Sequence, residues 1–166
     1  MEVKFLCDQM LGTLAKWLRI LGFDVCFADR IESDDEIIER AKKEGRVILT
    51  RDKYLVRRAK RENISTVEIK STDLDEQIRA VISEYPIDEN KILSRCSVCN
   101  NILAKIDKEK VKGKVPDRVY NRHDEFWYCE NCGRIYWKGT HWDNMKSRIE
   151  KINDGGKDSQ RERRIL

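Results

Sequence analysis

The sequence predicts an α/β fold, a parallel sheet with helices on both faces, followed by a small module held together by four cysteines. In residues 1–90, apolar stretches of strand length alternate four times with stretches of helical periodicity. Four β-α units in a row are typical of a parallel sheet covered by helices on both faces. Beyond them, two C-x2-C pairs and a cluster of aromatic residues replace this alternation.

The bounds of these elements follow from local signals. A capping box of Ser33 and Glu36 predicts the start of the second helix, and Gly22 and Gly45 predict the ends of the first and second. Pro86 stops the fourth helix. Strands are expected at 3–7, 23–28, 46–50 and 65–69, and helices at 11–21, 33–45, 54–61 and 74–85.

The change in character after Pro86 predicts three parts. They are an α/β domain at 1–90, a cysteine-containing module at 91–145 that begins with a linker, and a basic tail at 146–166. The module is too small for a core of its own and needs a cross-link such as a bound metal or a disulfide. The tail is expected to be helical at first and then, in its GGKDSQRERR stretch, frayed or disordered.

Composition limits the cellular setting. Hydrophobic residues make up 40% of the 166 residues and charged residues 39%, and no apolar run approaches the ~20 residues that span a bilayer. The first ten residues, MEVKFLCDQM, lack the apolar stretch of a secretory signal. A cytoplasmic protein without a membrane partner is therefore expected.

The charge is distributed unevenly along the chain. Residues 1–90 contain 16 Lys and Arg against 19 Asp and Glu, a net −3, and residues 91–166 contain 18 against 11, a net +7. This polarity favours a negatively charged partner held by the second half, with carboxylate chemistry in the first. The alternative is a generally charge-rich surface, as in many heat-adapted proteins.

Three carboxylates follow the predicted strands closely. Asp8 directly follows the first strand, Asp52 follows the third, and Asp34 lies in the first turn of the helix after the second. Ligands of open parallel sheets bind at this carboxyl edge. Converging carboxylates become favourable around a hard cation such as Mg²⁺ or Mn²⁺, which could serve phosphodiester chemistry.

A structural explanation is available for each acid taken singly. Asp34 can stabilise a helix N-terminus through the macrodipole, and Asp52 can cap the third helix. Asp29 and Asp73 also lie near strand ends but have loop roles open to them. Three acids on one edge are harder to explain by structure alone.

Four cysteines have the spacing of a metal site. Cys96, Cys99, Cys129 and Cys132 form two C-x2-C pairs separated by 29 residues, which suits tetrahedral, structural Zn²⁺. Four thiolates also suit iron, the competing metal. Cys7 and Cys26 lie singly in apolar stretches and are expected to be small buried residues.

Basic residues near the acids could hold the phosphates of RNA. Lys16 and Arg19 share a face of the first helix by spacing, and Arg51 and Arg58 flank Asp52. These cations could equally neutralise the acids. A lysine-rich loop, with Lys110, Lys112 and Lys114, lies between the cysteine pairs beside aromatic residues, a combination typical of single-stranded RNA surfaces.

Longer motifs resemble a known family. Asp8, D-D-E-I-I-E-R-A at 34–41 and V-I-L-T-R-D at 47–52 resemble the minimal pattern of PIN-fold nucleases. The run D-Q-M-L-G-T-L-A-K-W-L-R-I-L-G at 8–22, with R-C-S-V-C-N and I-Y-W-K-G-T-H-W, resembles the Mut-seven C-terminal RNase family, a PIN domain followed by a zinc ribbon. The resemblance covers residues 3 to about 145.

The resemblance implies a metal-dependent ribonuclease in which Asp8, Asp34 and Asp52 match acidic positions of the PIN active site. PIN nucleases present four acids, and the helix at 11–21 contains none. Asp35, Asp29 or Asp73 could replace the fourth.

The sequence therefore predicts an endoribonuclease with catalytic Mg²⁺ or Mn²⁺ at the acids and a zinc ribbon that assists RNA binding. The alternative is an inactive adaptor that binds RNA, the ribosome or an RNA-processing complex. A phospho-acceptor receiver domain also uses Asp residues after strands one and three, but Gln9 and Met10 stand where it needs a second acid.

Overall fold

The computed structural model describes residues 2–28 and 33–165, with side chains as far as Asp154. The chain divides into two compact units, one ending at Asn100 and the other starting at Asn101. Among the described residues, no helix combines the length and the apolar character needed to cross a membrane.

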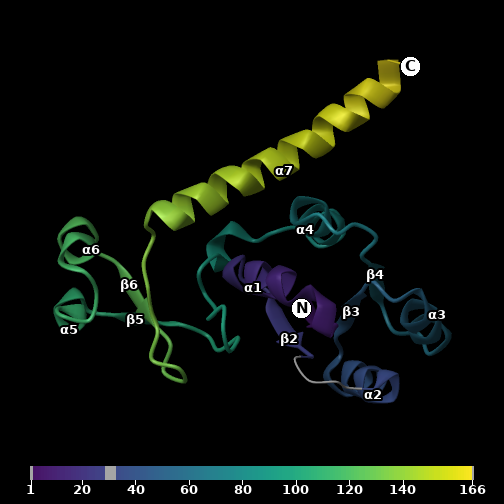
Figure 1. Ribbon diagram of the computed structural model, residues 1–166, viewed down its shortest axis with the longest axis horizontal. Coiled ribbons are helices and arrows are strands. Elements are labelled where there is room, and N and C mark those ends of the chain that lie inside the picture. The colour runs from purple at the N-terminus through teal and green to yellow at the C-terminus, as the bar shows by residue number, and fades with distance from the viewer. Residues whose placement is uncertain (1, 29–32, 166) are drawn as a thin grey trace. The chain divides into compact units, whose positions relative to one another are not determined.

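The first unit contains a four-stranded parallel sheet in the order β2-β1-β3-β4 (Figure 1). The predicted α/β class and the four β-α units are confirmed, with bounds that shift by a few residues. The strands are β1 Lys4–Cys7, β2 Asp24–Phe27, β3 Val47–Thr50 and β4 Thr66–Glu68. The helices are α1 Gly12–Ile20, α2 Asp34–Glu44, α3 Lys53–Arg61 and α4 Leu74–Ile82, with short 3-10 turns η1 Gln9–Leu11 and η2 Glu89–Lys91.

Alternating strand residues bury both faces of this sheet. Leu6 and Ile48 form a core cluster with apolar residues of α2 and α3. The preceding residue of β1, Phe5, points the other way and meets the rings of Phe23 and Tyr85 at centroid distances of 5.2 and 5.3 Å. Since successive strand residues face opposite sides, the sheet has helices on both faces, as predicted.

The predicted helix caps are present. The Ser33 hydroxyl accepts a hydrogen bond from the Glu36 N–H at 3.3 Å, and Gly45 ends α2 with φ +65°. Gly22 follows α1 with φ +97°, where any Cβ would clash with the carbonyl of Lys91. Glycine is therefore required at position 22 for both conformation and space.

The direction of the strand connections reverses between β1 and β3. The chain passes from β1 to β2 on one side, and then returns to β3 on the other side of β1. Such a reversal separates the loops that leave the two neighbouring strands, and ligands of open α/β sheets bind there. Asp8 and Asp52, which follow β1 and β3, flank this point.

The second unit contains a three-stranded antiparallel sheet. Its strands are β5 Ala104–Ile106, β6 Phe126–Tyr128 and β7 Ile135–Tyr136, and short helices α5 Lys108–Val111 and α6 Asp117–Arg122 lie between β5 and β6. Phe126 is fully buried with Val111 and Val115, and Trp137 packs against them. The final helix, α7 Thr140–Ile165, begins six residues before the predicted tail and continues through the stretch expected to fray.

Candidate functional site

Asp8 is held in place at the carboxyl end of β1. One carboxylate oxygen accepts a hydrogen bond from the Gln9 N–H at 2.7 Å, and the other accepts from the Thr50 hydroxyl at 3.0 Å. Thr50 is the last residue of β3 and is fully buried. Its hydroxyl oxygen also accepts from the Asp52 N–H at 3.0 Å. Thr50 therefore links two of the three sequence-predicted acids, Asp8 and Asp52, a role that no pattern in the sequence indicated.

Asp52 is the N-cap of α3. Its Oδ1 accepts from the N–H groups of Tyr54 and Leu55 at 2.9 and 3.4 Å. The structural role considered for this residue is thus present. It uses one carboxylate oxygen, and the side chain is exposed, so the cap is compatible with a second role.

Asp34 is brought within electrostatic reach of both other acids. It is the first residue of α2 and is half-buried. Burial raises its pKa, and the negative charges of Asp52 and Asp8 raise it further against the opposing charge of Arg58. The three predicted acids therefore interact electrostatically, although they come from three separate β-α units.

The three carboxylates do not form a closed set of metal ligands by themselves. In the described part of the chain, one group of three or more His, Cys, Asp or Glu has ligand atoms that all lie within 4.8 Å of one another, and it is made of cysteines. The carboxylates are thus more widely spaced than a closed set of ligands.

The candidates for a fourth acid have structural partners. Asp35 forms an ion pair with Arg58. Asp73 caps α4 by accepting from the Glu76 N–H at 3.1 Å. Asp29 lies outside the described residues.

The sequence assigns Arg19 to RNA binding, and in the structure its guanidinium is buried against backbone carbonyls. It is 8% exposed, and its guanidinium donates to the carbonyls of Val25, Ser97 and Val98 at 3.0 to 3.1 Å. Helical spacing places it on the same face as Lys16, but the Arg19 guanidinium contacts the turn between Cys96 and Cys99. Arg19 therefore fixes this pair to the sheet, whereas Lys16 is exposed.

Arg58 and Arg51 differ in their partners. Arg58 lies over the start of α2, and its hydrogen bond to Asp35 raises the pKa of its guanidinium. Arg51, between Thr50 and Asp52, is half-buried, and its Nε has no hydrogen-bond partner among the described residues. Neutralisation of an acid is thus seen for Arg58 alone of these two.

Two large side chains stand exposed beside the acids. Met10, in the turn after Asp8, is 72% exposed, and Tyr54, at the start of α3, is 61% exposed. An exposed aromatic ring next to a polar site is a surface on which a nucleobase can stack. Sequence reasoning did not single out either residue, because periodicity does not show which apolar side chains remain uncovered.

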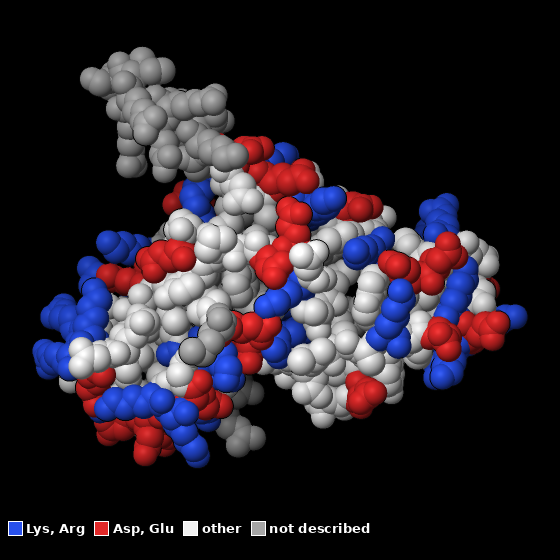
Figure 2. Space-filling view, turned by 180° about the vertical axis from the view of Figure 1, so that it is seen from behind, with Lys and Arg blue, Asp and Glu red and all other residues white. Residues whose placement is uncertain are grey.

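Figure 2 shows that basic and acidic side chains are interleaved on the face it presents. On this face, the net charge of either half of the chain does not produce a field of one sign. Phosphate binding on this face would therefore depend on local groups of cations rather than on overall charge.

The four predicted metal ligands come together. The sulfur atoms of Cys96, Cys99, Cys129 and Cys132 lie within 4.8 Å of one another. Tetrahedral Zn²⁺, with Zn–S near 2.3 Å, needs sulfurs about 3.8 Å apart, so the residues fit the ion.

Each cysteine pair ends in a turn of the same kind. The Asn100 N–H donates to the Cys96 carbonyl at 3.0 Å, and the Gly133 N–H donates to the Cys129 carbonyl at 2.8 Å. Asn100 and Gly133 have φ of +71° and +74°. Cys7, by contrast, is fully buried in β1, and burial raises the pKa of its thiol, which fits the structural role expected of it.

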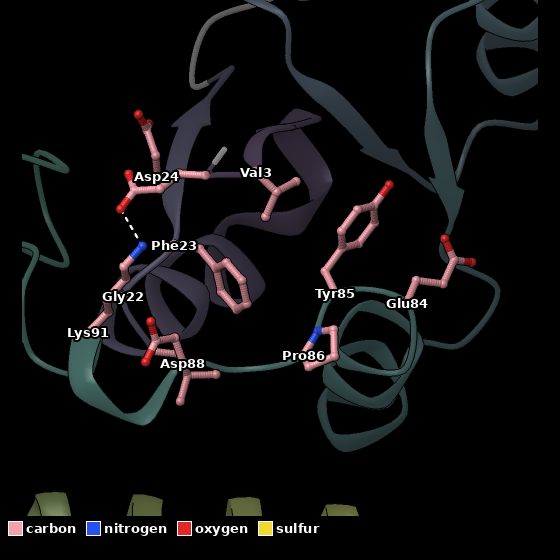
Figure 3. Close-up of a pocket in the computed structure, with 11 residues that line it drawn as sticks. Val3, Gly22, Phe23, Asp24, Glu84, Tyr85, Pro86, Asp88 and Lys91 are labelled. Atoms are coloured by element: carbon pink, nitrogen blue, oxygen red, sulfur yellow. Dashed lines mark hydrogen bonds and ion pairs between the residues drawn. The ribbon is translucent and has the colours of Figure 1, made fainter.

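A different hollow, of about 290 Å³, lies at the opposite edge of the sheet (Figure 3). Aromatic Phe23 and Tyr85 and several carboxylates line it. Two of its acids have counter-charges: Glu2 forms an ion pair with Lys91, and Asp24 forms one with Arg46 at 2.9 Å.

Comparison with known proteins matches the chain to a family. A family model described as the Mut7-C RNAse domain matches residues 3–149. No curated protein matches the chain.

Proposed function

Because the chain belongs to the Mut7-C RNAse domain family, we propose that it is a metal-dependent endoribonuclease of the PIN type. The position of Asp8 and Asp52 at the β1/β3 reversal, with Asp34 within electrostatic reach of both, carries this proposal. Burial raises the pKa of Asp34, and the negative charges of Asp52 and Asp8 raise it further; a cation would relieve this second contribution.

Asp8, Asp34 and Asp52 would hold Mg²⁺ or Mn²⁺. When bound, such an ion lowers the pKa of a coordinated water and neutralises charge at phosphorus. The protein's own residues orient the ligands: Thr50 fixes one oxygen of Asp8, and the start of α3 fixes one oxygen of Asp52. Tyr54 and Met10 offer stacking surfaces for unpaired bases, so the proposed substrate is single-stranded RNA.

Metal dependence can be tested directly. A labelled single-stranded RNA should be cut by the parent protein, spared in EDTA, and cut again when Mn²⁺ or Mg²⁺ is added. Added Zn²⁺ should not restore cleavage, because the acids supply hard oxygen ligands. Persistent cleavage in EDTA would contradict the proposal.

We further propose that the four cysteines hold one structural Zn²⁺ per chain. A site of four thiolates has no open position and contributes to folding rather than to chemistry. Purified protein should contain about one zinc per chain, and Cys129→Ser should lose it together with the structure of residues 101–145. Folded protein without zinc or iron would refute this site.

The zinc ribbon is proposed to assist RNA binding through its lysines. Lys110, Lys112 and Lys114 are exposed around α5. Replacing all three with Glu should weaken RNA binding and flatten its dependence on salt. Unchanged binding would place the RNA surface elsewhere.

An adaptor without catalysis is the second candidate. The observation that favours it is that Asp35 and Asp73, the described candidates for a fourth acid, already have partners. RNA binding by the parent protein without cleavage in either Mn²⁺ or Mg²⁺ would support the adaptor over the nuclease.

A further inference from the structure

A cavity beside the acids has no role in the site described so far. It has a volume of about 540 Å³ and lies where β3 and β4 end. The backbone continues the pairing of these strands there, since the Ile69 N–H donates to the Thr50 carbonyl at 2.8 Å. The lining residues are Arg51, Lys53, Glu68, Ile69 and Lys70.

This cavity has an excess of positive charge. Three of its lining side chains are cations and one is an acid, a net +2. In the part of the chain that the structure describes, none of the three cations forms an ion pair within 4.0 Å, whereas Arg58 nearby pairs with Asp35. The cations of this cavity therefore do not serve to neutralise the neighbouring acids by direct contact.

Arg51 gives an independent indication of a ligand. Its Nε atom is buried and lacks a hydrogen-bond partner among the described residues. A buried guanidinium N–H without an acceptor is costly, and such a group calls for a missing acceptor. Arginine is well suited to phosphate oxygens because its N–H groups form a planar fork.

The cavity and the acids share one short segment. The Thr50 hydroxyl donates a hydrogen bond to Asp8, and Asp52 is one of the acids. Arg51 and Lys53, which flank Asp52, line the cavity. A nucleic-acid strand whose reacting phosphodiester lies at the acids would thus place a neighbouring phosphate near the cavity.

We propose that this cavity is a phosphate subsite, which binds the phosphate next to the bond that is cut. The proposal rests on RNA being the substrate, as inferred above, and extends it. The enzyme then recognises at least two successive phosphates, and a dinucleotide with a terminal phosphate on the matching side is its smallest well-bound substrate.

The test measures binding without metal, so that no cleavage occurs. Calorimetry compares the uridine dinucleotide UpU with its 5′-phosphorylated and 3′-phosphorylated forms. One phosphorylated form should bind the parent about tenfold more tightly than UpU, and Lys70→Gln should remove most of that gain. Lys60→Gln, an exposed lysine of α3 outside the cavity, is the matched control and should keep it.

Two outcomes would overturn the subsite: neither phosphorylated form binds more tightly than UpU, or the gain survives in Lys70→Gln as it does in Lys60→Gln. Failure of the nuclease proposal is separate. If the phosphate gain depends on Lys70 but Mn²⁺ never supports cleavage, the subsite stands as part of an RNA-binding adaptor. On longer RNA, Lys70→Gln should also reduce the salt dependence of binding by about 0.7 in the slope of log K.

Discussion

The acids at the two edges of the four-stranded sheet differ in their hydrogen-bond and ion-pair partners. At the amino edge, Asp24 accepts hydrogen bonds from Arg46 and Asn100 at 2.9 and 2.8 Å, and Arg95 lies 3.8 Å away. At the carboxyl edge, Asp8 and Asp52 accept from backbone N–H groups and from Thr50. Matched charges stabilise the fold, whereas charges left without a counter-charge mark the edge at which we propose binding and chemistry.

The pKa values show the same contrast. Burial acts to raise the pKa of Asp24, but the hydrogen bonds from Arg46 and Asn100 and the nearby positive charges bring it below its usual value. For Asp34, burial and the neighbouring acids act together and raise the pKa. Removing the charge of Asp24 at the amino edge should therefore destabilise the fold, whereas removing the charge of Asp34 at the carboxyl edge should stabilise it.

The largest expected effect is on catalysis. Asp8→Asn and Asp52→Asn each preserve the shape but remove a charge, and each should lower the rate of RNA cleavage by about a thousandfold. RNA binding and thermal stability should persist. Asp88→Asn, an exposed carboxylate at the amino edge, is the control and should cleave like the parent. Cleavage by both carboxyl-edge variants at the parental rate would assign the activity to another site or a contaminant.

Breaking a matched pair should cost stability instead. Arg46→Gln leaves Asp24 without its main partner, and because the Arg46 and Asp24 side chains are only 10% and 16% exposed, it should lower the free energy of unfolding by about 2 kcal/mol. Lys42→Gln breaks the exposed pair with Glu62 and should cost within about 0.5 kcal/mol. Urea unfolding measures both, and equal losses would remove the distinction between these pairs.

The pH dependence of unfolding should reveal the lowered pKa of Asp24. Its contribution to stability is fully present above the ordinary carboxyl pKa near 4 and is lost as the pH falls through the lower folded value. Asp24→Asn should thus be less stable at pH 7 and lose less stability than the parent on acidification. If the stability of Asp24→Asn fell on acidification as steeply as that of the parent, Asp24 would not be a source of this stability.

The smallest expected effect is a gain in stability when Asp34 at the carboxyl edge loses its charge. Because the folded pKa of Asp34 is raised, its ionisation destabilises the metal-free protein at neutral pH, and this cost disappears as the pH falls through that value. Asp34→Asn should therefore be about 0.5 kcal/mol more stable at pH 7 and equal to the parent at low pH. A loss of stability at pH 7 would mean that Asp34 is paired like Asp24.

Short-range signals explain what could be predicted. Strand and helix periodicity, the Ser33 cap and the glycines at 22 and 45 act over a few residues, so the β-α units follow from the chain alone. The position of Asp8 and Asp52 directly after strands also follows, because the edge at which a parallel strand ends is fixed by its direction. The C-x2-C spacing likewise specifies four ligands for one ion.

Long-range packing decided the rest. The order β2-β1-β3-β4 makes Asp8 and Asp52 neighbours, and it depends on how helices cover the sheet rather than on any local pattern. Helical spacing treats Lys16 and Arg19 alike, but tertiary contacts bury Arg19 against backbone carbonyls and leave Lys16 exposed. The bridge from Thr50 to Asp8 spans 42 residues, and the pairing of Arg58 with Asp35 spans 23. Partners at such distances are set only when the core has packed, because that is what brings their elements together.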